Sequence, residues 1–193
     1  MAETIDYLRH GESEDLTLGI RSRQDTSLTE KGREEARQAA LAMKESGMSF
    51  DLILASPLLR AQQSAGEVAR VLGYPVEDIE TMLDLREREW GIGEGMHNEE
   101  IKKRWEGNFD KVPYAESEGE LEYRARLLYQ RLLERPEPRI LIVAHGTLGR
   151  KLRQVAAENE GQAGKVPDFN DESGKMKTGG VIRLYQRRPP QHV

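Results

Sequence analysis

The sequence predicts an α/β fold, with helices on both faces of a mostly parallel sheet. Short apolar runs at residues 4–8, 52–55, 140–144 and 181–185 have the length and composition of buried strands. Segments with helical spacing of apolar residues lie between most of these runs. Strands that alternate with helices are typical of a parallel sheet covered on both sides. With 193 residues, we expect one domain over 1–193.

Four helices are expected between and after these strands. Thr29 is suited to cap a helix that runs to about Ser46. A second helix is expected to start at Ser56-Pro57, because serine caps helices and proline suits the first helical position. A third is expected over 118–135, and a fourth follows Gly146.

Two segments depart from the alternation. Residues 86–117 are charged and also carry two tryptophans, a phenylalanine and a tyrosine. Two interpretations of this segment stay open. It is either a substrate-side insertion that forms a flap over a site, or a surface excursion held together by its own aromatic side chains. Residues 158–177 are polar and rich in glycine and aspartate, so we expect a long loop before the last strand.

Composition excludes several classes of protein. The formal charge of −5 argues against a nucleic-acid-binding surface. With no cysteine, the chain has no disulfide, thiolate metal site or cysteine nucleophile. The N-terminus has no signal-peptide pattern, and no apolar run is long enough to span a membrane. We therefore expect a cytoplasmic protein that contacts neither nucleic acid nor membrane.

Histidines and arginines follow three of the predicted strands. The first strand ends in Arg9-His10-Gly11, the strand at 140–144 ends in His145-Gly146, and the strand at 52–55 leads to Arg60. Ligands bind beyond the carboxyl ends of the strands in such sheets. A single His-Gly after a strand is more often structural, but the repeated setting with arginines beside it predicts one site.

The chemistry of a phosphoryl group explains this combination. Guanidinium groups match phosphate oxygens and stay charged at any working pH. A helix N-terminus, such as the one after Gly146, adds N–H donors to an anion. A neutral imidazole can attack phosphorus and form a covalent intermediate, while a second imidazole, if protonated, donates to the phosphoryl oxygens. Catalysis is then mostly positioning and charge stabilisation, so we expect no metal and no cofactor.

Five blocks of the sequence, in order, resemble the histidine phosphatase superfamily, also called the phosphoglycerate mutase-like family. They are Leu8-Arg9-His10-Gly11-Glu12-Ser13, Asp25-Thr26-Ser27-Leu28-Thr29-Glu30-Lys31-Gly32, Ala55-Ser56-Pro57-Leu58-Leu59-Arg60-Ala61, Leu85-Arg86-Glu87-Arg88-Glu89-Trp90-Gly91 and Ala144-His145-Gly146. The resemblance implies a three-layer α/β/α sandwich. It implies that His10 is the nucleophile that becomes phosphohistidine, and that Glu87 protonates the leaving oxygen and then activates water.

The resemblance also implies that Arg9, Arg60 and His145 hold the phosphoryl group, with Gly146 beside them. Glu89 and Glu94 lie in the same acidic segment as Glu87 and stay open as alternatives for the proton donor.

The sequence departs from the family pattern near the nucleophile. Many members carry an asparagine six residues after it, where this chain has Leu16. The glycine-aromatic pair that usually precedes the aspartate is replaced by Ser22-Arg23. Arg21 and Arg23 are therefore candidate substrate contacts.

The leading hypothesis is a phosphomonoesterase that acts on a small-molecule phosphate monoester. A phosphoglycerate mutase, which returns the phosphoryl group to a hydroxyl of the substrate, shares every catalytic residue and is the nearest alternative. A binding or regulatory protein on the same scaffold is an alternative of another class. Neither the substrate nor the oligomeric state follows from the sequence.

Overall fold

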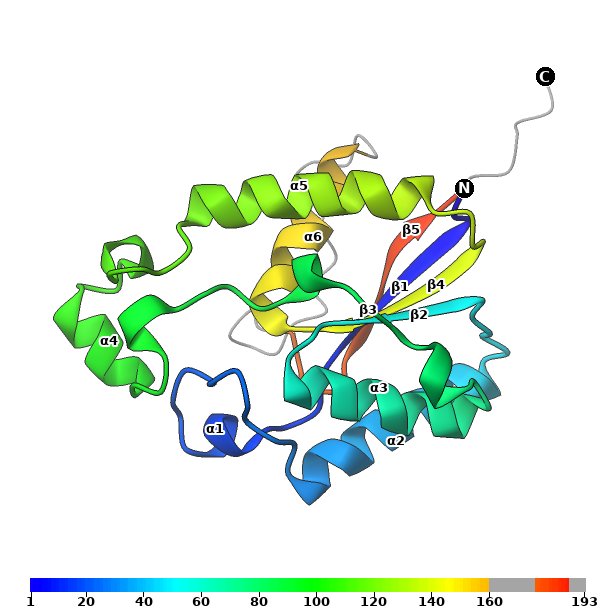
Figure 1. The fold of residues 1–193 in the computed structure, drawn as a ribbon, viewed down its shortest axis with the longest axis horizontal. Coiled ribbons are helices and arrows are strands. Elements are labelled where there is room, and N and C mark those ends of the chain that lie inside the picture. The colour runs from blue at the N-terminus through cyan, green and yellow to red at the C-terminus, as the bar shows by residue number, and fades with distance from the viewer. Residues whose placement is uncertain (160–175, 188–193) are drawn as a thin grey trace.

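The computed structural model describes residues 1–159 and 176–187. Within them, five strands form one sheet in the order β3-β2-β4-β1-β5 (Figure 1). The strands are β1 (Thr4–Arg9), β2 (Leu52–Ala55), β3 (Glu80–Thr81), β4 (Arg139–Ala144) and β5 (Val181–Gln186). The neighbours β3, β2, β4 and β1 are parallel, and β5 pairs antiparallel with β1.

The register of the parallel strands sets the place of the site. Arg9 lies opposite Ala144, and Ala55 lies opposite Val143. The residues that follow β1, β2 and β4 therefore emerge at one edge of the sheet, as expected from the sequence. His10, Ser56 and His145 are those residues.

Helices cover both faces of the sheet, which confirms the three-layer arrangement (Figure 1). On one face, α2 (Glu30–Glu45) and α3 (Leu59–Leu72) pack on Ile53 and Val143. On the other, α5 (Glu118–Glu134) and α6 (Gly146–Asn159) pack on Ile140, Ile142 and their neighbours. The remaining helices are α1 (Glu14–Thr17), α4 (Asn98–Arg104) and short 3-10 turns at 76–78, 83–85, 91–93 and 109–111.

Small residues let α2 approach the sheet closely. Gly32, Ala36, Ala40 and Met43 form its buried face, and Ala39 is half-buried beside them. A Cβ on Gly32 would lie 2.0 Å from the carbonyl oxygen of Glu12, which no other residue type allows. The first turn of α2 is thus packed against the loop that carries His10.

The predicted cap of α2 is confirmed, but the start predicted for α3 is wrong. Thr29 Oγ1 accepts a hydrogen bond from the Gly32 N–H at 3.0 Å. By contrast, α3 begins at Leu59, and its N-cap Leu58 makes no side-chain capping bond. Ser56 is instead bound to His145, at 2.7 Å between Oγ and Nε2, which keeps Ser56 outside the helix.

Two aromatic side chains of residues 86–117 pack on each other at the sheet edge. The rings of Trp90 and Phe109 pack edge to face, with centroids 5.6 Å apart, so the excursion is held together by its aromatic side chains. Both rings also line a cavity at the sheet edge. Within the predicted loop 158–177, Glu158 and Asn159 belong to α6, while 160–175 lie outside the described residues.

Candidate active site

His10 lies directly after β1 and is held in one orientation. Its Nδ1 is 2.7 Å from the carbonyl oxygen of Gly11, which can only accept, so Nδ1 carries the proton. Nε2 then bears the lone pair, and the Arg60 Nε–H donates to it at 3.3 Å. A Cβ on Gly11 would lie 2.0 Å from the Gly32 carbonyl oxygen, so the turn after His10 requires glycine.

His10 is held neutral by its surroundings. The ring is buried, and this burial lowers the pKa of His10 well below its usual range. The positive charges of Arg60 and Arg9 lower the same pKa further. A neutral imidazole with a lone pair on Nε2 is the form that attacks phosphorus.

The second histidine lies beside the first. The rings of His10 and His145 have centroids 5.1 Å apart and cross at 61°. His145 Nε2 lies 2.7 Å from Ser56 Oγ, while its Nδ1 has no hydrogen-bond partner in the described part of the chain. Burial, followed by the charge of Arg60, lowers the pKa of His145 well below its usual range.

The two arginines are held by different parts of the chain. Arg60 is 1% exposed, and besides His10 it binds the Arg23 carbonyl oxygen through Nη1 at 2.8 Å. Arg9 donates through Nη1 to the Met176 carbonyl oxygen, while its buried Nε has no partner among the described residues. A Cβ on Gly146 would lie 3.2 Å from that Nε, so a larger residue at 146 would crowd Arg9.

Glu87 occupies the N-terminus of α6. Its Oε2 accepts from the Thr147 N–H at 3.1 Å, and its Oε1 accepts from the Leu148 N–H at the same distance and from the Arg88 N–H at 2.9 Å. These backbone donors were expected to face the phosphoryl group. In the structure, the N–H groups of residues 147 and 148 donate to Glu87 instead, while Gly146 and Thr147 line the cavity.

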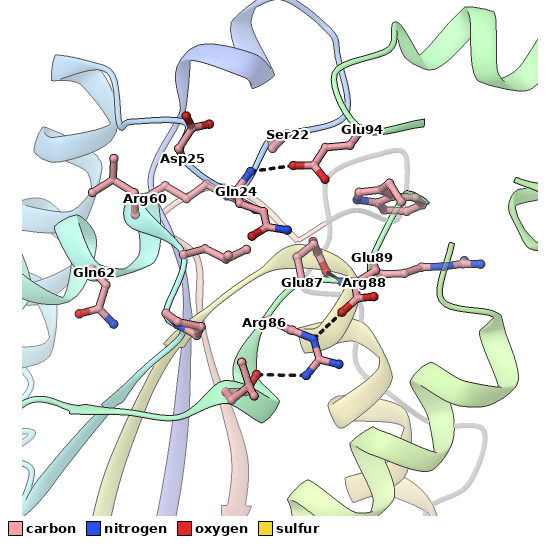
Figure 2. Close-up of a pocket in the computed structure, with 15 residues that line it drawn as sticks. Ser22, Gln24, Asp25, Arg60, Gln62, Arg86, Glu87, Arg88, Glu89 and Glu94 are labelled. Atoms are coloured by element: carbon pink, nitrogen blue, oxygen red, sulfur yellow. Dashed lines mark hydrogen bonds and ion pairs between the residues drawn. The ribbon is translucent and has the colours of Figure 1, made fainter. Parts of the chain in front are cut away.

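Two cavities meet at this edge of the sheet. One, of about 460 Å³, is lined by Arg9, His10, Gly146 and their neighbours. The other, of about 740 Å³, is drawn in Figure 2 and extends toward α3 and residues 83–90. Arg60, Glu87, Ser22 and Trp90 line both cavities, so the proton-donor candidate stands where they join.

The neighbouring carboxylates are engaged elsewhere. Glu89 binds the Arg86 guanidinium at 2.9 Å, and Glu94 accepts from the Gln24 N–H at 2.9 Å (Figure 2). Both line only the larger cavity, whereas His10 lines the smaller one. Geometry therefore favours Glu87 among the carboxylates that the sequence left open.

The structure separates the two substrate-contact candidates. Arg21 lines the smaller cavity together with His10 and Leu16. Arg23 is exposed and lies outside the lining of both cavities, and its side chain forms an ion pair with the buried Asp15 at 2.6 Å.

Three residues that the sequence did not mark as site residues support the site. The Tyr7 hydroxyl donates to the His145 carbonyl oxygen at 2.7 Å and accepts from its N–H at 2.9 Å. Ser56 binds the His145 ring, and Arg124 donates to the carbonyl oxygens of Asp84 and Arg86 beside Glu87. Tyr7 sits inside an apolar strand and Arg124 inside a charged helix, so no local signal marks them.

The described residues contain neither a metal-binding cluster nor a membrane-spanning helix. Among residues 1–159 and 176–187, no group of three or more His, Asp or Glu side chains is arranged to hold a metal ion. No helix in the same residues is long and apolar enough to cross a bilayer.

Residues 6–166 match the family model described as the histidine phosphatase superfamily, branch 1. The chain belongs to the histidine phosphatase superfamily. The order of the five matching blocks, and the cavity in which Arg9, His10 and Arg60 meet, are consistent with this membership.

Relatives within the superfamily carry different names. A 2,3-bisphosphoglycerate-dependent phosphoglycerate mutase of Bartonella tribocorum is 34% identical over 106 residues, which cover 54% of this chain and 52% of the mutase. The chain thus spans about half the length of the curated relatives it matches.

Solved structures of histidine phosphatases share the fold. The α-ribazole phosphatase of Shigella flexneri superposes with a TM-score of 0.72 at 25% identity, over 93% of this chain and 89% of that one. A mycobacterial glucosyl-3-phosphoglycerate phosphatase gives a TM-score of 0.66 at 25% identity, over 82% and 81% of the two chains.

Proposed function

We propose that this histidine phosphatase superfamily member is a phosphomonoesterase that works through a phosphohistidine on His10. One observation carries the proposal. The bond from His10 Nδ1 to the Gly11 carbonyl oxygen leaves Nε2 as the nucleophilic atom, inside the cavity that Arg9 and Arg60 line. A neutral, oriented imidazole beside two guanidinium groups is suited to attack on a phosphate dianion.

In the first step, His10 Nε2 forms a bond to phosphorus as the bond between phosphorus and the leaving oxygen breaks. The Glu87 carboxyl group gives its proton to that oxygen, and the product is an alcohol. Arg9 and Arg60 compensate the charge on the phosphoryl oxygens during the transfer. We assign His145, whose ring lies 5.1 Å from that of His10, to the same phosphoryl group.

In the second step, water attacks phosphorus and the bond to Nε2 breaks. The Glu87 carboxylate takes the proton from this water, which restores its acid form for the next cycle. Inorganic phosphate leaves, and His10 returns to its neutral state.

Hydrolysis is favoured over transfer within the substrate by two observations. The proton-donor block reads Glu87-Arg88-Glu89-Trp90-Gly91, which is closer to the phosphatase pattern than to the mutase pattern. Structures that superpose over more than four-fifths of the chain carry phosphatase names, whereas the match to mutases covers about half.

The mutase relatives keep phosphoglycerate mutase as a second candidate. In that reaction a substrate hydroxyl, rather than water, accepts the phosphoryl group from His10. The two are distinguished by the product, which is inorganic phosphate for a phosphatase and an isomeric ester for a mutase.

A phosphate-release screen over metabolite phosphates tests the proposal, with His10→Ala as the inactive variant. His97→Ala is the matched control, because His97 is exposed and lines neither cavity. We expect turnover and an acid-labile phosphoenzyme in the wild type and in His97→Ala, and neither in His10→Ala. Labelling that persists in His10→Ala, or turnover that yields only isomerised ester, would contradict the proposal.

A further inference from the structure

The Arg21 side chain has no hydrogen-bond acceptor within residues 1–159 and 176–187. Its guanidinium carbon lies 4.0 Å from the centroid of the Trp90 ring and 4.6 Å from that of Phe109, so two aromatic rings hold it in place. Its buried Nε has no partner, and its guanidinium forms no hydrogen bond or ion pair with any described residue. Arginines buried in protein interiors are normally paired with an anion.

The cavity that Arg21 lines holds more positive than negative charge. Five cationic side chains line it, namely Arg9, Arg21, Arg60, Lys102 and Arg150. Only two of the lining residues, Glu87 and Glu99, carry carboxylates, and Glu99 is already paired with Lys102 at 2.6 Å. Arg9 and Arg60 flank His10 and suffice for a phosphoryl group, which leaves Arg21 and Arg150 without a function in its transfer.

Arg21 and Arg150 line the same cavity, and their charges repel each other. Arg150 is exposed on α6 and makes no ion pair with any described residue. Burial, partly offset by Glu87, lowers the pKa of Arg21 to about 10, and the charges of Arg88 and Arg150 contribute to this lowering. Two cations that repel each other at one cavity wall bind an anion that lies between them.

The larger cavity has the opposite character. Four carboxylates line it, Asp25, Glu87, Glu89 and Glu94. Three cations also line it: Arg60 is shared with the smaller cavity, while Arg86 is paired with Glu89 at 2.9 Å and Arg88 with Asp110 at 2.5 Å. An anionic group would meet repulsion there. A negatively charged part of a substrate is therefore directed to the smaller cavity.

We infer that Arg21, together with Arg150, forms a subsite for a second anionic group of the substrate. The substrate is then a compact phosphate monoester that also carries a carboxylate or a second phosphate. The phosphoryl group to be transferred lies on Arg9, Arg60 and His10, and the second anion lies beneath the Trp90 and Phe109 rings at Arg21. This assignment rests on the proposed function of the same site.

Three esters with one carbon skeleton test the inference. Glycerol 3-phosphate ends in a neutral hydroxymethyl group, 3-phosphoglycerate ends in a carboxylate, and glycerol 1,3-bisphosphate ends in a second phosphate. The measured quantity is kcat/KM of each ester with a second anion relative to that of glycerol 3-phosphate. Comparison of 3-phosphoglycerate with glycerol 1,3-bisphosphate separates a carboxylate-binding subsite from a phosphate-binding one.

The wild type should prefer at least one of the two esters that carry a second anion over glycerol 3-phosphate. Arg21→Gln should lower this kcat/KM ratio about 10- to 100-fold. Arg150→Gln should lower it in the same direction, and since Arg150 is exposed on α6 this variant retains the fold if Arg21→Gln does not. Arg104→Gln is the control, because Arg104 also packs on an aromatic ring, that of Trp105 at 4.9 Å, but lines neither cavity.

Equal kcat/KM for the three esters, or a preference that survives both Arg21→Gln and Arg150→Gln, would overturn the subsite. A loss confined to Arg86→Gln would place the second anion in the larger cavity and would overturn it as well. Phenyl phosphate, which has no second anion, tests the proposed function separately. If the wild type does not hydrolyse it, calorimetric binding of the three esters to the same variants makes the same comparison.

Discussion

At the scale of single residues, Glu87 differs from the acidic residues around it by what holds it. Backbone N–H groups of three residues fix its carboxylate where the two cavities join, whereas Glu89 is half exposed and paired with Arg86. A proton donor must be held within reach of the leaving oxygen, and lying in the same acidic segment as Glu87 does not provide this. The same positioning makes its role separable from that of its neighbour.

Glu87→Gln should discriminate between leaving groups. An alkoxide is a strong base and needs a proton as the bond breaks, while a nitrophenolate does not. We expect kcat/KM for an alkyl phosphate to fall by about 10²–10⁴-fold, the usual contribution of general acid catalysis. The aryl ester should lose far less.

The comparison is made on kcat/KM, because Glu87 also serves the second step and steady-state turnover would conceal the difference. Glu89→Gln is the matched control and should leave the ratio of the two esters unchanged. Equal losses on both esters in Glu87→Gln would mean that this residue supports the cavity without donating a proton.

At the scale of elements, α5 begins with a reciprocal cap. Ser117 Oγ accepts from the Glu120 N–H at 3.2 Å, and the Glu120 carboxylate accepts from the Ser117 N–H at 2.8 Å. Residues 84–87 are tied to this helix by Arg124, which donates to three of their carbonyl oxygens. The cap therefore fixes the helix that positions the segment of Glu87.

Ser117→Ala should lower the free energy of unfolding by about 1 kcal/mol, the usual value of an N-cap side chain. Urea denaturation measures this difference. Ser46→Ala is the control, because Ser46 ends α2 through its backbone N–H alone, and we expect a change within about 0.5 kcal/mol. Equal effects of the two changes would show that the cap of α5 contributes no stability of its own.

Elements with a strong pattern were predictable from the sequence, and weak ones were not. The four apolar strands and the spans of α2 and α5 agree with the prediction to within a residue or two. β3 was missed because its two residues, Glu80 and Thr81, are exposed and carry no apolar pattern. The start of α3 was misplaced because the local signal at Ser56-Pro57 does not show that Ser56 is bound to His145.

The same division holds for the candidate site. Strand ends followed by His-Gly and Arg bring His10, Arg60 and His145 to one edge, which the sequence alone indicates. That Glu87 takes the N–H donors of Thr147 and Leu148 depends on how two distant segments pack, and no local spacing encodes it.

At the scale of the whole molecule, two buried histidines link stability to pH. The pKa values of His10 and His145 lie well below the ordinary value of 6.5 in the folded state. As the pH falls below about 6.5, the unfolded chain takes up a proton on each ring and the folded chain does not. Stability is therefore full above this pH and is lost as the pH falls toward the folded-state pKa values.

We expect the free energy of unfolding to fall by as much as about 1.4 kcal/mol per pH unit for each of the two rings between about pH 6 and pH 5. Urea denaturation across this range measures the slope. His10→Gln and His145→Gln should each lower this slope by the contribution of one ring, about 1.4 kcal/mol per pH unit at most. His97→Gln, at an exposed ring, should leave the slope unchanged. A slope that is unchanged in both buried-site variants would contradict the linkage.

The order of the strands has a consequence for biosynthesis. β1 lies between β4 and β5, so it gains its first partner only when residue 139 has emerged from the ribosome. At the usual rate of elongation this takes on the order of ten seconds. Arg9 also waits for the Met176 and Gly180 carbonyl oxygens, which its side chain and N–H bind. Throughout that interval the apolar strand before His10 is an unpaired edge, the kind of segment that pairs with other chains when it is exposed.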